Sequence, residues 1–346
     1  MFMSRNNASI LAHHKHRLRF NVESLFLMEK EMVIIEDKII REIIELLKSK
    51  LRKATISSKK DLSLSAPRFV FVCGKAFVEG QETIRSHTID ILEKIKVAND
   101  YGTKNVSILC VISEYLYVQD LSEDIFSFEK MLAEISDKII IVAESPGTFC
   151  ELGAFVMDEN CRAKTIVINE DNKNFKNSFI TKGPIKMLEN ENEHNVILHN
   201  GLERLKYSLE YNYKIEEIAK ENLNIYINND SKEIRLKSLI YELANIIELF
   251  QPLEFFEVEI LYKELKGFDR YVISNTAGHK IRSIKQVLAL MEQMGVVKKE
   301  HGYYSVNKKI SCFNTMFRIS RKEFNDIRIA YLNRMEKLQP QRMEIL

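Results

Sequence analysis

Two glutamates, Glu144 and Glu151, flank one loop whose residue types suit chemistry on a sugar. An apolar run over 139–143 precedes Glu144 and predicts a buried parallel strand, at whose carboxyl end ligands bind. Gly147 lets the backbone approach a ligand closely, and the amides over 148–151 can face an anion where the next helix begins. Two carboxylates beside a phosphate-binding loop predict glycosyl chemistry on a nucleoside or nucleotide.

Cleavage of an N-glycosidic bond creates an oxocarbenium-like centre at the sugar C1′, which a carboxylate can stabilise or attack. We predict that Glu151 is this catalytic carboxylate, and that the positive end of the helix dipole keeps it ionised. Glu144 is expected to hold sugar hydroxyls through charge-assisted hydrogen bonds. Glu114, which follows an earlier strand, is expected to hold the other side of the ligand.

Further substrate contacts are predicted from two turns. Ser145 and Thr148 lie in the loop itself, and Ser145 is not expected to be a nucleophile because the sequence lacks a GxSxG elbow. The turn at Gly74 has neither a GxGxxG fingerprint nor a Walker lysine pattern, yet Lys75 and Arg85 could meet phosphates. The plainer alternative for Glu151 is a helix-end charge without a catalytic role.

Short apolar runs alternate with amphipathic segments between residues 67 and 200. We expect strands at 68–73, 106–112, 139–143, 165–169 and 195–199, and helices at 81–98, 127–135 and 149–160. This alternation predicts an α/β fold with a Rossmann-like parallel sheet and right-handed crossovers.

The rest of the chain is predicted to be mostly helical. Residues 1–66 are expected to form an N-terminal helical extension with a helix over 22–52, and 67–200 the catalytic domain. Residues 201–270 are expected to be a helical connector, with helices over 202–220 and 232–249. Three histidines within 13–16 have no acidic or cysteine neighbours, so a metal site is not predicted there.

Residues 271–346 are predicted to form a winged helix-turn-helix domain. A helix over 281–294, capped by Gly295, precedes two short strands around a turn at 301–302. The basic residues expected to contact nucleic acid or a protein partner are Lys280, Arg282, Lys285, Lys298 and Lys299. A merely solvated face is an alternative of equal weight.

Composition narrows the class of protein. The chain has 346 residues, enough for two domains or slightly more, and its 51 basic and 49 acidic residues give no overall nucleic-acid signal. The 5 cysteines include no CxxC pair, which favours reduced thiols in the cytoplasm and no zinc site. The sequence shows no membrane span and no signal peptide, so we expect a cytoplasmic protein.

Residues 126–155 resemble the nucleoside deoxyribosyltransferase-like effectors of bacterial retrons. The similarity continues through 70–74, 177–186 and the C-terminal helix and wing, and covers about residues 67–310. The resemblance implies a toxin of antiviral defence. Such a toxin is held by a retron reverse transcriptase and its multicopy single-stranded DNA (msDNA) or non-coding RNA. It also implies an N-glycosidase that hydrolyses NAD as substrate, with no cofactor. In this resemblance Glu151 matches the catalytic glutamate, and Glu144 matches a sugar-positioning carboxylate that is commonly Asp.

Two rival functions stay open at this point. One is a nucleotide sensor that binds without turnover and carries a DNA-binding winged helix. The other is a nucleotide phosphoribohydrolase with a PGGxGTxxE loop, of which this chain keeps Thr148-x-x-Glu151 but only one glycine after Pro146. Nucleoside deoxyribosyltransferases also use an asparagine from a neighbouring subunit. No residue of this chain is matched to that asparagine, so the resemblance favours hydrolysis over base exchange. A homo-oligomer or a larger retron assembly is compatible with the resemblance.

Overall fold

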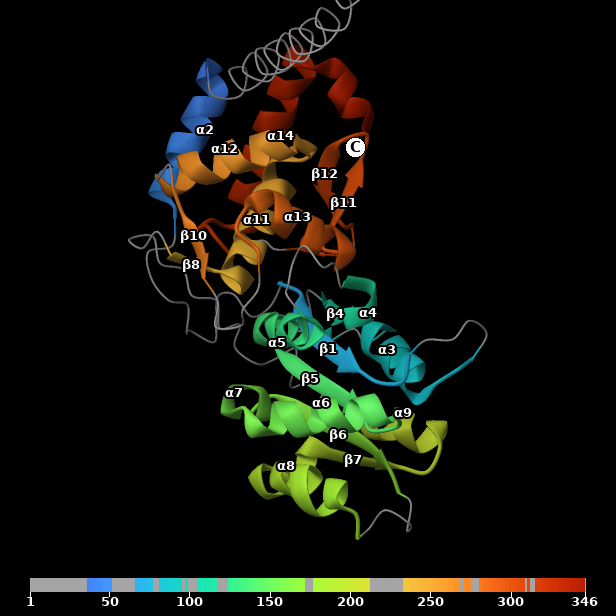
Figure 1. Cartoon of the computed structure of the whole chain (residues 1–346). Coiled ribbons are helices and arrows are strands. Elements are labelled where there is room, and N and C mark those ends of the chain that lie inside the picture. The colour runs from blue at the N-terminus through green and yellow to red at the C-terminus, as the bar shows by residue number, and fades with distance from the viewer. Residues whose placement is uncertain are drawn as a thin grey trace, which may run out of the picture.

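The structure is a computed structural model, and its described residues form a sheet lobe and a helical lobe (Figure 1). It describes residues 36–51, 66–76, 81–94, 97–98, 105–116, 124–171, 177–211, 233–267, 270–274, 280–308, 310–311 and 315–345. The histidines of 13–16 and most of the predicted N-terminal extension therefore lie outside the described residues.

Five parallel strands form the centre of the sheet lobe. They are β1 (Arg68–Cys73), β4 (Ile108–Val111), β5 (Lys138–Val142), β6 (Thr165–Glu170) and β7 (Val196–His199), in the order β4-β1-β5-β6-β7. All six residues of β1 are buried, as the continuous apolar run predicts for a strand covered on both faces. The predicted α/β, Rossmann-like fold is confirmed.

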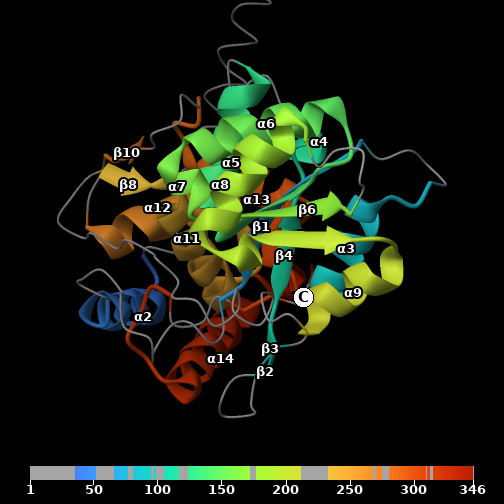
Figure 2. The same cartoon turned by 90° about the horizontal axis from the view of Figure 1, so that it is seen from below.

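Helices cover both faces of this sheet (Figure 2). One face packs on α3 (Ile84–Lys94) and α9 (Leu202–Tyr211). The other packs on α5 (Ile125–Ile135), α6 (Pro146–Met157) and α8 (Lys186–Glu191). From β1 the chain passes through α3 to β4 on one face, and from β5 it passes through α6 to β6 on the other. The change of direction between β1 and β5 is a topological switch point, the usual ligand-binding position in such sheets.

Two predicted helices end earlier than the sequence indicates. Asp158 accepts hydrogen bonds from the amides of Asn160 and Cys161, so it caps a new helix, α7 (Glu159–Arg162), and ends α6. The predicted helix over 81–98 ends at Lys94, because β2 (Val97–Ala98) pairs instead with β3 (Asn105–Val106).

The helical lobe is built around the buried helix α11 (Leu236–Phe250). It continues through β9 (Leu253–Glu254), α12 (Phe255–Lys266), α13 (Ile284–Gln293), β11 (Val297–Glu300), β12 (Tyr303–Val306) and α14 (Arg321–Leu338). The predicted helix and hairpin near the C-terminus are present. The hairpin turn has φ 50° at His301 and 88° at Gly302, the positive values that a two-residue type I′ turn requires.

The packing groups the segments differently from the predicted domain boundaries. β9 pairs with β12, in a sheet of order β11-β12-β9, so the segment before residue 271 shares a sheet with the C-terminal hairpin. Helix α2 (Lys38–Ser49) joins the same lobe, where Arg334 Nε donates to Asp37 Oδ2 at 2.8 Å. Helix α9 packs on α3 and β7 instead. The four-domain division stays a prediction.

Two polar contacts join the lobes at the amino-terminal edge of the sheet. Tyr241 of α11 donates its hydroxyl to the Pro67 carbonyl at 2.6 Å, and Lys237 Nζ lies 2.7 Å from Asp137 Oδ1. Helix α11 also contacts α5, and α13 contacts α4 (Ser113–Leu116). The helical lobe therefore touches two of the helices that surround the candidate site.

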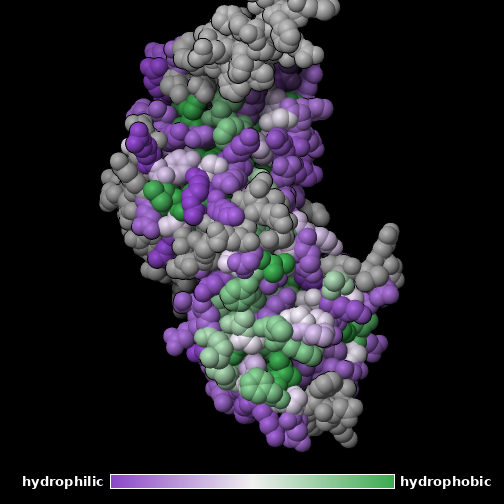
Figure 3. Space-filling model, in the orientation of Figure 1, coloured by the Kyte–Doolittle hydropathy of each residue, from purple (hydrophilic) through white to green (hydrophobic). Residues whose placement is uncertain are grey.

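The surface has an apolar area on the visible face of the sheet lobe (Figure 3). The exposed large apolar side chains of the sheet lobe include Met157 of α6, which is 73% exposed, and Phe179, just before η2 (Thr181–Ile185), which is 84% exposed. Apolar areas of this kind are typical of surfaces that contact other molecules. In the described part of the chain, no helix combines the length and apolarity needed to cross a membrane.

Candidate active site

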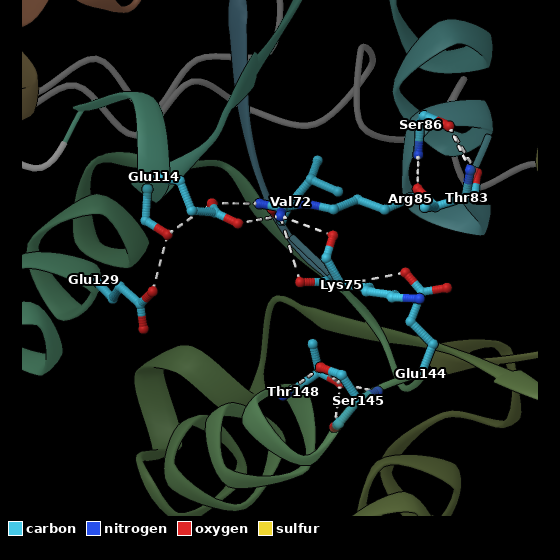
Figure 4. Close-up of polar contacts among 12 residues, drawn as sticks. Val72, Lys75, Thr83, Arg85, Ser86, Glu114, Glu129, Glu144, Ser145 and Thr148 are labelled. Atoms are coloured by element: carbon cyan, nitrogen blue, oxygen red, sulfur yellow. Dashed lines mark hydrogen bonds and ion pairs between the residues drawn. The ribbon is translucent and has the colours of Figure 1, made fainter. Parts of the chain in front are cut away.

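Glu144 ties two loops together at the switch point. It follows β5, is half-buried, and its Oε1 accepts the backbone amide of Lys75 at 3.0 Å (Figure 4). Because Lys75 follows β1, this hydrogen bond joins the segments that follow β1 and β5. Glu144 therefore lies at the carboxyl-terminal edge of the sheet, as the sequence predicts, and its contact with a sugar stays a prediction.

Ser145 and Thr148 shape the loop. The Ser145 amide donates to Thr148 Oγ1 at 3.0 Å, and the Thr148 amide donates to Ser145 Oγ at 3.4 Å, which together form a capping box. The Phe149 amide donates to the Ser145 carbonyl at 3.1 Å. The prediction that the amides over 148–151 face an anion is therefore wrong for Thr148 and Phe149, because the helix begins earlier than expected. Gly147 lies exposed in the first turn.

Glu151 lies in the second turn of α6, because that helix begins at Pro146. Its Oε2 is buried and has no hydrogen-bond partner among the residues that the structure describes. Burial raises the pKa of Glu151 to about 7, and the charge of Glu129 adds to this, while a hydrogen bond with the Cys73 thiol lowers it. The helix dipole acts mainly within the first turn, so it does not hold the pKa of Glu151 at its ordinary value, contrary to the expectation.

Glu129 is a site residue that the sequence reasoning missed. It lies on α5, is only 8% exposed, and accepts a hydrogen bond from Ser113 Oγ at 2.9 Å. Burial raises its pKa as well. The signal was present in the sequence, since Glu129 shares a helix face with the buried Leu132 and Ala133, three and four residues later. A glutamate on such an apolar stripe calls for a partner or a function.

Arg85 and Glu114 pair with each other. Arg85 Nη2 donates to Glu114 Oε2 at 2.8 Å and to the Val72 carbonyl at 2.7 Å, and Nη1 also contacts Glu114 (Figure 4). The Arg85 side chain is 1% exposed. The predicted contact of Arg85 with a phosphate is therefore corrected: its guanidinium secures the end of β1. Glu114 is correspondingly occupied by Arg85.

Gly74 makes room for this arginine. A Cβ atom at Gly74 would lie 2.5 Å from Cδ of Arg85, closer than real contacts allow. We predicted Gly74 as a substrate contact, and its first role in the structure is to let Arg85 reach β1. Lys75 is exposed just after β1, and its contact with a phosphate stays a prediction.

The predicted nucleic-acid residues lie in the other lobe. Lys280, Arg282, Lys285, Lys298 and Lys299 are all exposed, and Lys299 Nζ lies 5.3 Å from the ring centre of Tyr304. Residues 271–346 contain 14 basic and 6 acidic residues, although the whole chain is nearly neutral. This segment is therefore locally basic, as contact with a polyanion requires.

A family model described as STM3845 retron effector protein matches residues 81–299, which is more than half of the chain. The chain belongs to this retron effector family. It is 27% identical over 261 residues to a protein of retron Ec73 from Escherichia coli, covering 70% of this chain and 78% of that protein. It is also 40% identical over 93 residues to a protein of retron Ec86 from Escherichia coli, covering 24% of this chain and 30% of that protein. Both relatives are named as proposed ribosyltransferase/DNA-binding proteins.

The shifted pKa of Glu151 predicts how the stability of this retron effector depends on pH. The folded state holds a proton on Glu151 up to about pH 7, whereas the unfolded chain releases it near 4.5. The unfolded state therefore binds fewer protons between these values, and the free energy of unfolding should fall as pH rises through this window. Thermal unfolding of wild type and Glu151→Gln from pH 4 to 8 checks this. Wild type should lose stability relative to the variant, and parallel curves would contradict the assigned pKa.

Proposed function

We propose that this retron effector is an N-glycosidase that hydrolyses NAD or a related nucleotide, with Glu151 as nucleophile or oxocarbenium stabiliser. The observation that carries the proposal is the Glu151 carboxylate, whose buried Oε2 has no partner among the described residues, at the sheet edge that also holds Glu144. The names of the two retron relatives, which include ribosyltransferase, support chemistry at a ribosyl C1′.

The chemistry needs one ionised carboxylate near C1′. In NAD the nicotinamide nitrogen is cationic, so when the C1′–N bond breaks the base leaves neutral with the bonding electron pair. Glu151 then shares its charge with the oxocarbenium centre or forms a C1′–O bond to it. Water supplies the hydroxyl to C1′ and releases one proton. A carboxyl whose pKa lies close to neutral can accept that proton, and the raised pKa of Glu151 meets this condition.

The two glutamates near Glu151 have different surroundings, and we expect them to have different roles. Glu129 is buried and hydrogen-bonded, whereas Glu114 is neutralised by Arg85. Two carboxyl groups with raised pKa values in one small region favour sharing of protons. Glu129 can therefore hold a proton near Glu151, and a variant of Glu129 is a second test of the proposal.

Product analysis tests the proposal. The full-length effector is incubated with NAD and with a purine nucleoside monophosphate, alone and with the retron reverse transcriptase and msDNA, and the products are separated by chromatography. Free nicotinamide is expected from NAD. Release of only the purine base would favour the phosphoribohydrolase, and tight NAD binding without product under all conditions would favour the nucleotide sensor.

We also propose that the basic segment 271–346 of the helical lobe contacts the retron nucleic acid or its reverse transcriptase. Reversing the charges of Lys298 and Lys299 to glutamate should weaken association roughly tenfold or more at low salt, and reduce the slope of log Kd against log salt by about 2. Reversal of the exposed Lys182 and Lys186 in the sheet lobe is the matched control. Mobility-shift titrations over a salt series measure both quantities. Unchanged binding would show that the wing takes no part.

A further inference from the structure

A second polar group lies at the sheet edge, on the opposite face from Glu151. Glu170 and His199 are register partners at the ends of β6 and β7, so their side chains point to the same face. Residues two positions earlier on each strand, Ile168 and Ile197, belong to the core cluster under α3 and α9. Glu170 and His199 therefore face the α3 and α9 side, whereas Glu151 comes from α6 on the other side.

His199 shows that this group is built for a ligand. The residue is 8% exposed, and its Nδ1 is buried with no hydrogen-bond partner among the described residues. An unmade hydrogen bond on a buried polar atom is costly, so such atoms are commonly found where a ligand completes them. Burial lowers the pKa of His199, while the charges of Glu170 and Glu144 act in the opposite direction. The His199 imidazole is therefore close enough to Glu144 for the charges of the two groups to interact.

The distance from the switch point suits an elongated substrate. Glu144 follows β5 and His199 ends β7, two strands away, which corresponds to about 10 Å along the sheet edge. On the opposite side of the crevice, the ends of β1 and β4 are occupied by the buried Arg85 and its partner Glu114. A substrate with its scissile bond at Glu151 would therefore extend along the sheet edge toward β6 and β7.

We propose that Glu170 and His199 bind the second ribose of a dinucleotide substrate and make the effector select NAD over NADP. This inference rests on the proposed glycosidase function. The Glu170 carboxylate accepts hydrogen bonds from the two hydroxyls of that ribose, and His199 Nδ1 exchanges a hydrogen bond with one of them. A 2′-phosphate there would bring negative charge against Glu170 and would lose the hydroxyl donor.

Three substrates separate this role from the reaction itself. Values of kcat/KM are measured on the full-length effector, alone and with its retron partners, for NAD, NADP and nicotinamide mononucleotide, which has no second ribose. Glu170→Arg should shift the NAD-to-NADP ratio toward NADP by roughly tenfold or more. His199→Phe should raise KM for NAD roughly fivefold with little change in kcat. Neither variant should alter hydrolysis of nicotinamide mononucleotide.

The control is Glu193→Arg, which makes the same charge change on an exposed residue before the opposite end of β7. An unchanged NAD-to-NADP ratio in Glu170→Arg, with hydrolysis intact, would overturn the second-ribose site and leave the glycosidase standing. If wild type hydrolyses none of the three substrates, the proposed function fails. Calorimetric Kd values for NAD and NADP with wild type and Glu170→Arg then decide the ribose site, which requires the same shift in ratio.

Discussion

Glu151→Gln protein is expected to fold and to release nicotinamide from NAD at least about 100-fold more slowly than wild type, with losses up to about 10⁴-fold or beyond. The amide keeps the shape of the side chain but cannot carry the negative charge that a developing oxocarbenium centre needs. Folding should be preserved, because removing an ionisable group whose pKa is raised by burial removes a cost of desolvation.

The measurement is single-turnover and steady-state nicotinamide release at equal concentrations of folded protein. Glu159→Gln on α7 is the matched control, since Glu159 is exposed and follows the same helix. The control should retain wild-type rates. Full activity in Glu151→Gln would eliminate Glu151 as the catalytic carboxylate, and equal losses in both variants would indicate damage to the fold.

Arg85→Met is expected to lower the free energy of unfolding by about 3 kcal/mol, the range for breaking one side of a buried ion pair. The methionine fills part of the volume but leaves Glu114 and the Val72 carbonyl without the donors that Arg85 supplies. Because the Glu114 side chain is 39% exposed, water can recover part of the loss. Urea denaturation followed by circular dichroism measures the change.

Two further variants make this result specific. Arg204→Met removes an exposed arginine whose Nη1 lies 3.9 Å from Asp171, and should cost less than about 1 kcal/mol. Gly74→Ala leaves both charges in place but puts a Cβ against Arg85, so it should destabilise the protein in the same direction. If Arg85→Met unfolds at the urea concentration of wild type, the pair does not hold the end of β1.

Local sequence patterns predicted the strands beside the site, because such patterns depend on neighbouring residues alone. The apolar runs of β1, β5 and β6 are strands, since a strand buried on both faces needs apolar side chains in succession. The hairpin around His301 and Gly302 follows from the turn itself. The position of Glu144 follows from the strand that precedes it.

Properties that depend on distant residues could not be predicted in this way. Arg85 meets Glu114 from 29 residues away, which turns a predicted phosphate ligand into a structural cation. Glu129 lies near Glu151 only because α5 packs on β1, and β9 joins the hairpin of β11 and β12 only through pairing with β12. These contacts are set by how the elements pack, and no local pattern encodes them.

The sequence by itself determined the type of sheet, the strand that ends before Glu144, and the two carboxylates that we propose for the site. Only the tertiary structure decided that the pKa of Glu151 is raised, because desolvation arises when residues from several elements surround the carboxyl group. It also decided the partnership of Arg85 and the buried, unpartnered Nδ1 of His199. Hydrophobic periodicity depends on the order of residues along the chain, whereas burial and electrostatic environment depend on how the elements pack together.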